Sequence, residues 1–308
     1  MHPKKGLPSA YLARYPSAHS QRAMADALER AAGIIGRTAT DLPWHEITYE
    51  VVSAMRARLM ARYSPATTNL TLSAVRGIVR MCWQLRLVEH EAYIRAVDVP
   101  PWHAESLPAG RMIPPAELRR LFAAASGPSP LNRRDSAMLA ILLGCGLRAA
   151  EVVHLTVADY DPATGEVRVL RGKGGKDRMA YLAAPGRQAM DPWLEVRGPS
   201  SGALLCDARR AGDPCVGGKM PPLSSKGIYY RVRALVKAAS LGHASPHDFR
   251  HTHISLLLEG GYDISIVQRL VGHSSVTTTA RYDRRPESVR RAAAESIDIP
   301  YQGANHAK

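Results

Sequence analysis

The sequence predicts a mainly α-helical protein with a small antiparallel β-sheet, divided into two domains. Three observations support this. Residues 20–96 repeat apolar side chains at helical spacing. A proline-rich stretch follows at residues 97–115. Two short β-prone segments then flank a glycine-rich turn. With 308 residues and 45% hydrophobic side chains, the chain is long enough to bury a core in each domain.

The first domain is expected to consist of helices. Ser20 can cap a helix over residues 21–28, because its hydroxyl can accept a hydrogen bond from a backbone N–H of the first turn. A second helix is expected near residues 46–62. Ser64, followed by proline, opens a third, since proline in a first turn loses no helical hydrogen bond. The apolar stripe of this third helix would comprise Leu72, Val75, Val79, Cys82 and Trp83.

The boundary between the domains is predicted from proline. Residues 97–115 contain five prolines, which deny helix continuation and favour an extended chain: Pro100, Pro101, Pro108, Pro114 and Pro115. The sequence therefore predicts a first domain at residues 1–103, a linker at residues 104–113 and a second domain at residues 114–308.

The second domain mixes helices and strands. A helix begins at Pro114-Pro115, and the strongly apolar residues 134–143 form a core helix. Residues 166–170 and 178–182 are β-prone, and the glycine-rich turn between them favours a hairpin. Helices return at residues 226–240 and continue to the end, including one after Tyr282.

The charge of the chain indicates a polyanionic partner. Lys and Arg number 41 and Asp and Glu 27, a net charge of +14, which favours nucleic acid over a charge that only aids solubility. Five arginines of the first domain would form either a solvated basic face or a phosphate-contacting face: Arg56, Arg58, Arg62, Arg76 and Arg80.

Cysteine usage and apolar runs bear on the compartment. Cys82, Cys145, Cys206 and Cys215 have no zinc-finger spacing and make no disulfide framework, which favours a reducing compartment. The start of the chain lacks the apolar run of a signal peptide, and the longest apolar stretch, residues 137–145, is too short to span a bilayer. We therefore expect a cytoplasmic protein with no membrane partner.

Five residue clusters in the second domain contain side chains that could act in catalysis. Each cluster also has an ordinary structural explanation when it is taken alone. Arg148 could simply pair with Glu151, Lys173 could belong to a tight turn, and Tyr282 could be a packed aromatic. His247 and Arg250 share a helix face, a spacing that many helices show by chance. The clusters are Gly146 to Glu151, Gly172 to Gly175, His247 to Thr252, Val271 to Ser275 and Thr277 to Tyr282.

Together and in this order, the clusters resemble the tyrosine recombinases, also called phage integrases. The matching motifs are GLRxxE, a lysine in a β-turn, HxxRHT and GHxxxxTTxxY. The nine-residue spacing from His273 to Tyr282 is typical of the Xer-like members. The resemblance covers about residues 114–285, and more weakly the helical segment before it. It implies a helical, SAM-like core-binding domain followed by a mixed α/β catalytic domain.

The resemblance also implies a reaction. Tyr282 would attack a DNA phosphate to form a 3′-phosphotyrosine, with Arg148 and Arg250 binding the non-bridging oxygens. His273 would donate a further hydrogen bond to the phosphate, and His247 would accept or relay the proton of the phenol. Lys173 would protonate the leaving oxygen, with Lys176 as the neighbouring alternative. The set expected to be catalytic is Arg148, Lys173, His247, Arg250, His273 and Tyr282.

The implied reaction needs neither ATP nor a metal, because the phosphotyrosine stores the energy of the broken bond. The expected cofactor set is therefore empty. The implied partner is double-stranded DNA with inverted half-sites, bound by a homotetramer across two sites, with an accessory recombinase or DNA-bending protein as a further possibility. Two alternatives stay open at this point: relaxation of DNA in the manner of a type IB topoisomerase, and a catalytically silent DNA-binding relative.

Overall fold

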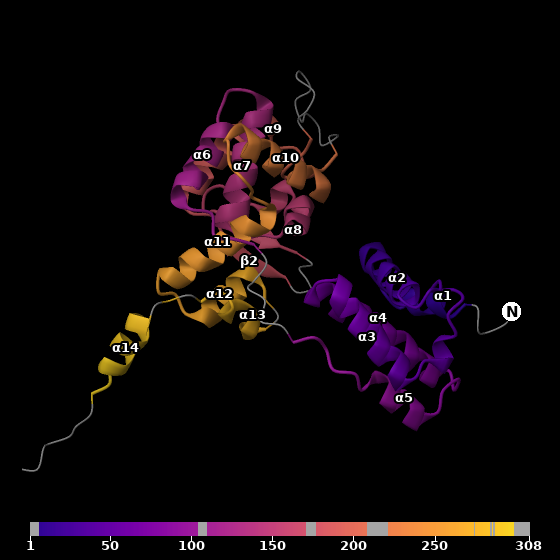
Figure 1. Cartoon of the computed structure of the whole chain (residues 1–308). Coiled ribbons are helices and arrows are strands. Elements are labelled where there is room, and N and C mark those ends of the chain that lie inside the picture. The colour runs from indigo at the N-terminus through magenta and orange to yellow at the C-terminus, as the bar shows by residue number, and fades with distance from the viewer. Residues whose placement is uncertain are drawn as a thin grey trace, which may run out of the picture. The chain divides into compact units, whose positions relative to one another are not determined.

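The computed structural model divides into two compact units, residues 1–106 and 107–308. It is mainly helical with one two-stranded antiparallel sheet, which confirms the predicted fold class (Figure 1). The structure describes residues 6–103, 110–170, 177–207, 221–273, 275–283, 285 and 287–298. Most of the expected linker falls outside these ranges, so its bounds stay a prediction. Within the described residues, we find no helix with the length and apolar character that a membrane span requires.

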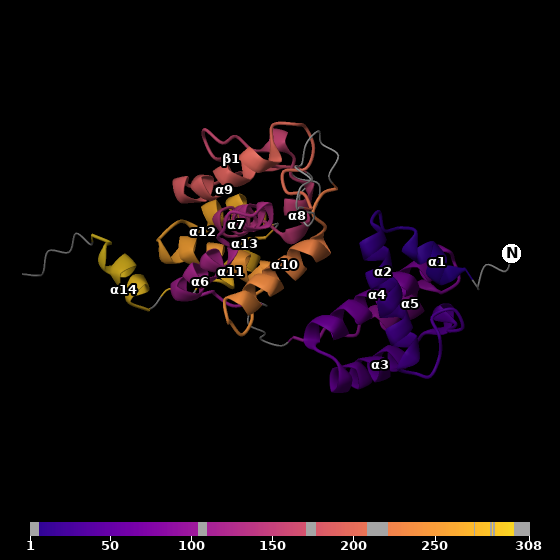
Figure 2. The same cartoon turned by 90° about the horizontal axis from the view of Figure 1, so that it is seen from above.

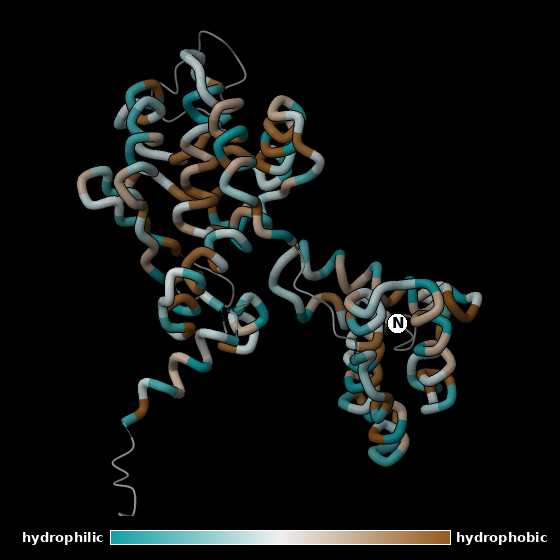
Figure 3. The backbone as a smooth tube through the Cα atoms, turned by 60° about the vertical axis from the view of Figure 1, so that its left-hand side comes forward, coloured by the Kyte–Doolittle hydropathy of each residue, from teal (hydrophilic) through white to brown (hydrophobic). Residues whose placement is uncertain are grey.

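The first unit is built around its longest helix, α4. Within residues 6–103 the helices are α1 (Leu7–Leu12), α2 (Ala18–Gly33), α3 (Tyr49–Arg62), α4 (Pro65–Gln84) and α5 (His90–Val97), with a 3-10 turn η1 (Trp44–Glu46). Helix α4 contacts each of the other four. Leu72, Val75, Val79 and Cys82, four of the five residues expected in its apolar stripe, are buried. Apolar and polar stretches recur along the helices, as is expected of helices that bury one face (Figure 3).

Two helix starts in this unit test the capping predictions. Ser64 caps α4 as predicted, since its hydroxyl accepts a hydrogen bond from the backbone N–H of Thr67 at 3.4 Å. The prediction that Ser20 caps the first long helix is wrong. Ser17 is the cap, and its hydroxyl accepts from the backbone N–H of Ser20 at 3.1 Å. Two serines at this spacing both suit the role, and only the backbone conformation decides between them.

The second unit packs helices around α7. Its described helices are α6 (Pro115–Ala125), α7 (Pro130–Gly144), α8 (Ala149–His154), α9 (Ala184–Arg197), α10 (Ser225–Ala238), α11 (Pro246–Glu259), α12 (Ile264–Val271), α13 (Val276–Ala280) and α14 (Glu287–Glu295), with a 3-10 turn η2 (Val157–Asp159). Helix α7 is buried along most of its length, with α9 on one side and α6 and α11 on the other (Figure 2). This confirms the core helix that the sequence predicts.

The small sheet is antiparallel, as predicted. Strand β1 (Glu166–Val169) pairs with β2 (Arg178–Tyr181), and Glu166 lies opposite Tyr181. The predicted turn between the strands, with Lys173, lies outside the described residues. Among the cysteines of the described residues, Cys82 and Cys145 are free and buried, and Cys206 is disulfide-bonded.

Candidate active site

Arg148 is placed by a tight turn after α7. Gly146 has φ +59°, a left-handed conformation that favours glycine, and a Cβ built there would lie 2.5 Å from Cδ2 of His253. Two residues later Arg148 forms the N-cap of α8, and its backbone N–H donates to Oε2 of Glu151 at 2.9 Å. Its side chain remains 30% exposed, the most accessible of the three arginines at this site.

Glu151 is the centre of an arginine cluster. Its carboxylate accepts from Nη1 of Arg148 at 2.8 Å and from Nη2 of Arg178 at 2.7 Å, and Nη1 of Arg250 lies 4.0 Å away. Burial alone opposes ionisation of this carboxyl. The hydrogen bonds and charges of Arg178 and Arg148 outweigh burial and lower the pKa of Glu151 to about 2. Glu151 is therefore a permanent anion that holds the guanidinium groups in place.

Arg250 lies beneath this cluster on α11, with 2% of its surface exposed. Nη1 donates to the carbonyl of Gly146 at 2.8 Å and Nη2 to that of Val271 at 2.7 Å. Burial and the neighbouring charge of Arg148 lower the pKa of Arg250 to about 9, so the group is still a cation near neutral pH. Its two carbonyl bonds tie the turn before α8 to the end of α12.

The start of α11 fixes His247 and Arg250 on one helix. Ser245 is the N-cap, and the buried Asp248 accepts from both the backbone N–H and the hydroxyl of Ser245 at 2.7 Å. Asp248 also accepts from the backbone N–H of Arg111 at 2.6 Å, which ties the first described segment of the second unit to this helix. His247, in the first turn, is exposed.

His273 follows the left-handed Gly272 that ends α12. Its Nδ1 forms a hydrogen bond with Oγ1 of Thr279 at 2.8 Å, so Nε2 is the ring nitrogen that this bond does not use. Burial, followed by the charges of Arg250 and Arg148, lowers the pKa of His273 to about 4. His273 is therefore neutral near pH 7, and a hydrogen bond to a phosphate would come from a neutral imidazole.

Tyr282 packs between two histidines. Its ring centroid lies 4.8 Å from that of His251 in an edge contact and 6.1 Å from that of His273 in a stacked one. The residue is 6% exposed. Burial raises the pKa of Tyr282, while the positive charges of Arg250 and Arg148 act in the opposite direction. The phenol is thus protonated without DNA, yet it lies within the field of the arginine cluster.

The structure brings four of the six expected site residues into one cluster: Arg148, Arg250, His273 and Tyr282. His247 lies near enough for its charge to act on His273. Lys173 lies outside the described residues. Among those residues, we find no group of three or more His, Cys, Asp or Glu side chains that could hold a metal ion.

Sequence reasoning missed Arg178, on strand β2. Besides its pair with Glu151, its Nε donates to the carbonyl of Leu270 at 3.1 Å, in the last turn of α12. A Cβ built on Gly272 would lie 3.0 Å from Cδ of Arg178, so glycine gives this arginine its room. Arg178 links the sheet, Glu151 and the helix that leads to His273. Its only sequence signal is position, as the first residue of the strand after the glycine-rich turn.

Comparison with known sequences decides the family. The phage integrase family profile matches residues 111–288, more than half of the chain. The chain belongs to the phage integrase family. This integrase is 32% identical over 227 residues to a tyrosine recombinase XerD of Pseudomonas aeruginosa, covering 73% of each chain. It is 36% identical over 233 residues to a tyrosine recombinase XerD of Mycobacterium tuberculosis, covering 72% of this integrase and 70% of that protein.

Solved structures share the fold of this integrase. A Tn1549 transposon integrase in complex with a circular intermediate DNA matches with a TM-score of 0.70 at 17% identity, over 94% of this integrase and 98% of that chain. A lambda integrase dimer bound to a COC' core site matches with a TM-score of 0.65 at 17% identity, over 90% and 95%. A lambda integrase tetramer bound to a Holliday junction matches with a TM-score of 0.66 at 17% identity, over 91% and 76%.

Proposed function

We propose that this integrase is a site-specific recombinase in which Tyr282 attacks a DNA phosphate and becomes linked to the 3′ end. The family and its relatives named tyrosine recombinase support the recombinase activity. The observation that supports Tyr282 is its ring stacked on His273, within the field of Arg148 and Arg250. Tyr282 forms the new O–P bond as the bond from phosphorus to the 5′-oxygen breaks.

The arginine cluster suits the charge that develops in this reaction. Attack on a phosphodiester places additional negative charge on the non-bridging oxygens, and preorganised cationic donors stabilise it. Arg148 is the accessible donor, and Arg250 lies behind it as a buried positive charge. Nε2 of His273 donates to the same phosphate in the neutral tautomer whose Nδ1 accepts from the hydroxyl of Thr279.

Two proton transfers complete the proposed reaction. The phenol must lose its proton as the O–P bond forms, and His247 accepts or relays it from the exposed start of α11. The departing 5′-oxygen takes a proton from Lys173. Rejoining reverses these steps, with a 5′-hydroxyl attacking the phosphotyrosine, so the bond energy is conserved without ATP.

The assembly and the biological task are proposed from the relatives. Solved relatives are bound to DNA as a dimer and as a tetramer, and we infer that this integrase also assembles on DNA, as a homotetramer across two sites with inverted half-sites. The XerD likeness favours resolution of chromosome dimers. The transposon-integrase likeness favours movement of a mobile element. We infer that this integrase works in the cytoplasm of a bacterium, since its XerD relatives are bacterial.

The test uses a half-site selected from random DNA and a nicked duplex that traps the cleaved state. The wild-type chain should form a covalent adduct, and Tyr282→Phe should form none while binding the half-site within about threefold, because only the attacking hydroxyl is lost. Tyr262→Phe, a change at an exposed tyrosine of the same unit, is the matched control and should keep the adduct. An adduct in Tyr282→Phe would refute the assignment. Relaxation of any supercoiled plasmid without recombinant product would indicate topoisomerase activity instead.

A further inference from the structure

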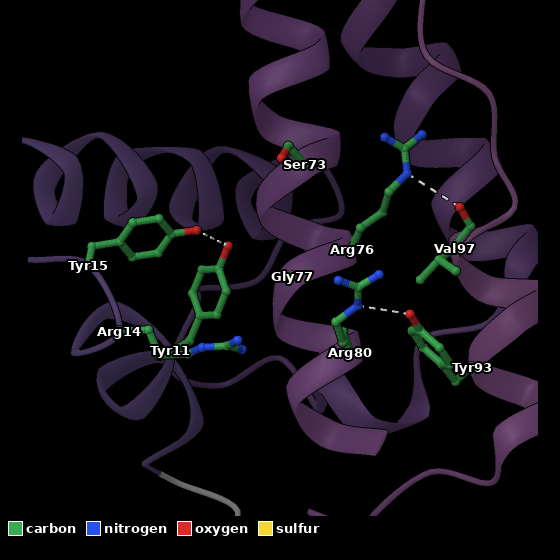
Figure 4. A pocket seen from close by; sticks show the side chains of 9 residues that line it. All are labelled: Tyr11, Arg14, Tyr15, Ser73, Arg76, Gly77, Arg80, Tyr93 and Val97. Carbon is green, nitrogen blue, oxygen red and sulfur yellow. Dashed lines mark hydrogen bonds between the residues drawn. The ribbon is translucent and has the colours of Figure 1, made fainter. Parts of the chain in front are cut away.

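A polar hollow in the first unit plays no part in the proposed strand chemistry. It has a volume of about 450 Å³ and lies between α1, α4 and α5. Figure 4 shows the side chains that surround it. The lining residues are Tyr11, Arg14, Tyr15, Ser73, Arg76, Gly77, Arg80, Tyr93 and Val97. Three of them are arginines, and none of these described lining residues is acidic, so the hollow concentrates positive charge.

Two of the arginines are held in place by neutral groups. Nε of Arg76 donates to the carbonyl of Val97 at 3.3 Å, and its Nη2 donates to the carbonyl of Val99. Nε of Arg80 donates to the hydroxyl of Tyr93 at 3.0 Å. These bonds fix the guanidinium groups without neutralising them. A ligand therefore meets donors that are already ordered, which reduces the entropy lost on binding.

The hollow keeps further donors for a ligand. Within the described residues Arg80 donates a hydrogen bond only through Nε, so its two Nη groups are available to a ligand. The hydroxyls of Tyr11 and Tyr15 lie 2.7 Å apart, and that of Tyr11 donates to Sδ of Met24 at 4.0 Å, so the two phenols add polar oxygens to the wall rather than a spare donor. Exposed Arg14 extends into the same space (Figure 4).

Gly77 shapes the floor of the hollow. A Cβ built on it would lie 2.3 Å from the hydroxyl of Tyr11, so only glycine allows the phenol to lie against α4 here. Arg76 and Arg80 flank this glycine one turn apart on the same face of α4. The glycine thus lets the Tyr11 phenol pack against α4 next to the turn that carries the two arginines.

We propose that this arginine hollow binds a phosphate group. Guanidinium groups match phosphate oxygens in geometry, and several positive charges with no carboxylate among the lining residues suit a multiply charged anion. The phosphate belongs either to the DNA backbone or to a free phosphate compound. The proposal does not depend on the catalytic assignment, because the hollow is formed entirely by the first unit.

The test measures binding of inorganic phosphate to the full chain by calorimetry at low salt. All proteins carry Arg148→Ala, so that the proposed catalytic cluster contributes less. Arg14→Gln and Arg80→Gln should each weaken phosphate binding at least fivefold. Arg37→Gln, the same charge change at an exposed arginine outside the hollow, should alter it less than twofold. The exposed side chain of Arg14 makes no hydrogen bond to the other described residues, so Arg14→Gln should fold even where Arg80→Gln is destabilised.

A second arm identifies the source of the phosphate. The affinity for duplex DNA is measured against salt concentration in the same proteins. If the phosphate is in DNA, the slope of log affinity against log salt should fall by about 0.9 for each lost contact in Arg14→Gln, and not in Arg37→Gln. An unchanged slope with weakened phosphate binding would assign the hollow to a free phosphate compound. Phosphate binding and salt slope both equal to those of Arg37→Gln would overturn the proposal.

Discussion

The two units each contain a group of three arginines, and the groups differ in what surrounds them. In the second unit Arg148, Arg178 and Arg250 gather around the buried Glu151. In the first unit two arginines of the hollow, Arg76 and Arg80, bond to carbonyls and a phenol, and no carboxylate is among the described lining residues. A carboxylate cancels part of the local charge but fixes geometry, whereas neutral acceptors leave the charge intact. The carboxylate-centred arrangement of the second unit suits catalysis, which needs fixed positions. The arrangement of the first unit, which has no carboxylate, suits binding of an anion.

The largest expected effect tests whether Arg148 stabilises the transition state. Arg148→Ala should slow strand cleavage by about 10²–10³-fold, the usual loss when one donor to a developing negative charge is removed. Half-site binding should change much less, because the remaining Lys and Arg side chains would still attract the phosphate backbone. Arg233→Ala, at an arginine on α10 outside the Glu151 cluster, serves as control. A cleavage rate within threefold of wild type would exclude Arg148 from the reaction.

Arg178 tests whether the carboxylate-centred arrangement depends on its third arginine. Arg178→Ala should lower the free energy of unfolding by about 3 kcal/mol, since it breaks a buried ion pair, and should also slow cleavage. Urea denaturation and the nicked-duplex assay measure the two effects. Nη1 and Nη2 of Arg178 each donate to one oxygen of Glu151, at 3.1 and 2.7 Å. Arg178→Lys keeps the charge but loses this paired contact, so it should recover stability better than cleavage. Wild-type stability in Arg178→Ala would show that the ion pair of Arg178 with Glu151 does not stabilise the fold.

The pH dependence of stability tests the packing behind the cluster. Burial lowers the pKa of His253 to about 4, and the charge of Arg250 acts in the same direction. A hydrogen bond to the carbonyl of Leu143 opposes this decrease in part. The unfolded chain takes up this proton near pH 6.5, but the folded chain does so only near pH 4. The contribution of neutral His253 to the free energy of unfolding is therefore fully present above pH 6.5, and it is lost as the pH falls from 6.5 to 4.

That loss should amount to about 3 kcal/mol for His253, from a shift of roughly 2.5 pKa units at 1.36 kcal/mol each. His253→Gln removes the titrating group, so its stability should fall less than that of the wild type between pH 7 and pH 4. Urea denaturation at both pH values gives the difference. Equal losses in the two proteins would contradict the assignment to His253.

The smallest expected effect concerns the orientation of His273. Thr279→Val removes the hydroxyl that bonds Nδ1 of His273, which should cost about 1 kcal/mol and slow cleavage by about fivefold. Thr279→Ser keeps the hydroxyl and should keep most of the activity. If Thr279→Val and Thr279→Ser cleave DNA at the same rate, the orientation of His273 does not depend on this hydrogen bond.

The sequence predicted most of what local chemistry determines. The fold class, the proline start of α6, the apolar α7 and the two strands follow from periodicity and turn residues. Ser17 displaced Ser20 as a cap because both serines suit that role locally. The site residues could be predicted because the order of their motifs along the chain is distinctive. No single motif, however, predicts which of these side chains lie close together in space.

What could not be predicted depends on contacts between distant residues. Arg178 reaches Glu151 across 27 positions of sequence, and no local pattern announces an ion pair between a strand and a helix. The hollow likewise joins Tyr11 to Arg80 and Tyr93 from three different helices. Arg80 was noted as part of a basic face, but its bond to a phenol follows only from the packing of α5 on α4.

The central claim is that the phenol held beside His273 is the group that joins DNA. The most direct measurement is mass spectrometry of the peptide left on DNA after the trapped adduct is digested with protease and nuclease. The chain has 12 tyrosines, so the result discriminates among many candidates. The account predicts a nucleotide on Tyr282 alone. A nucleotide on any other residue would contradict it.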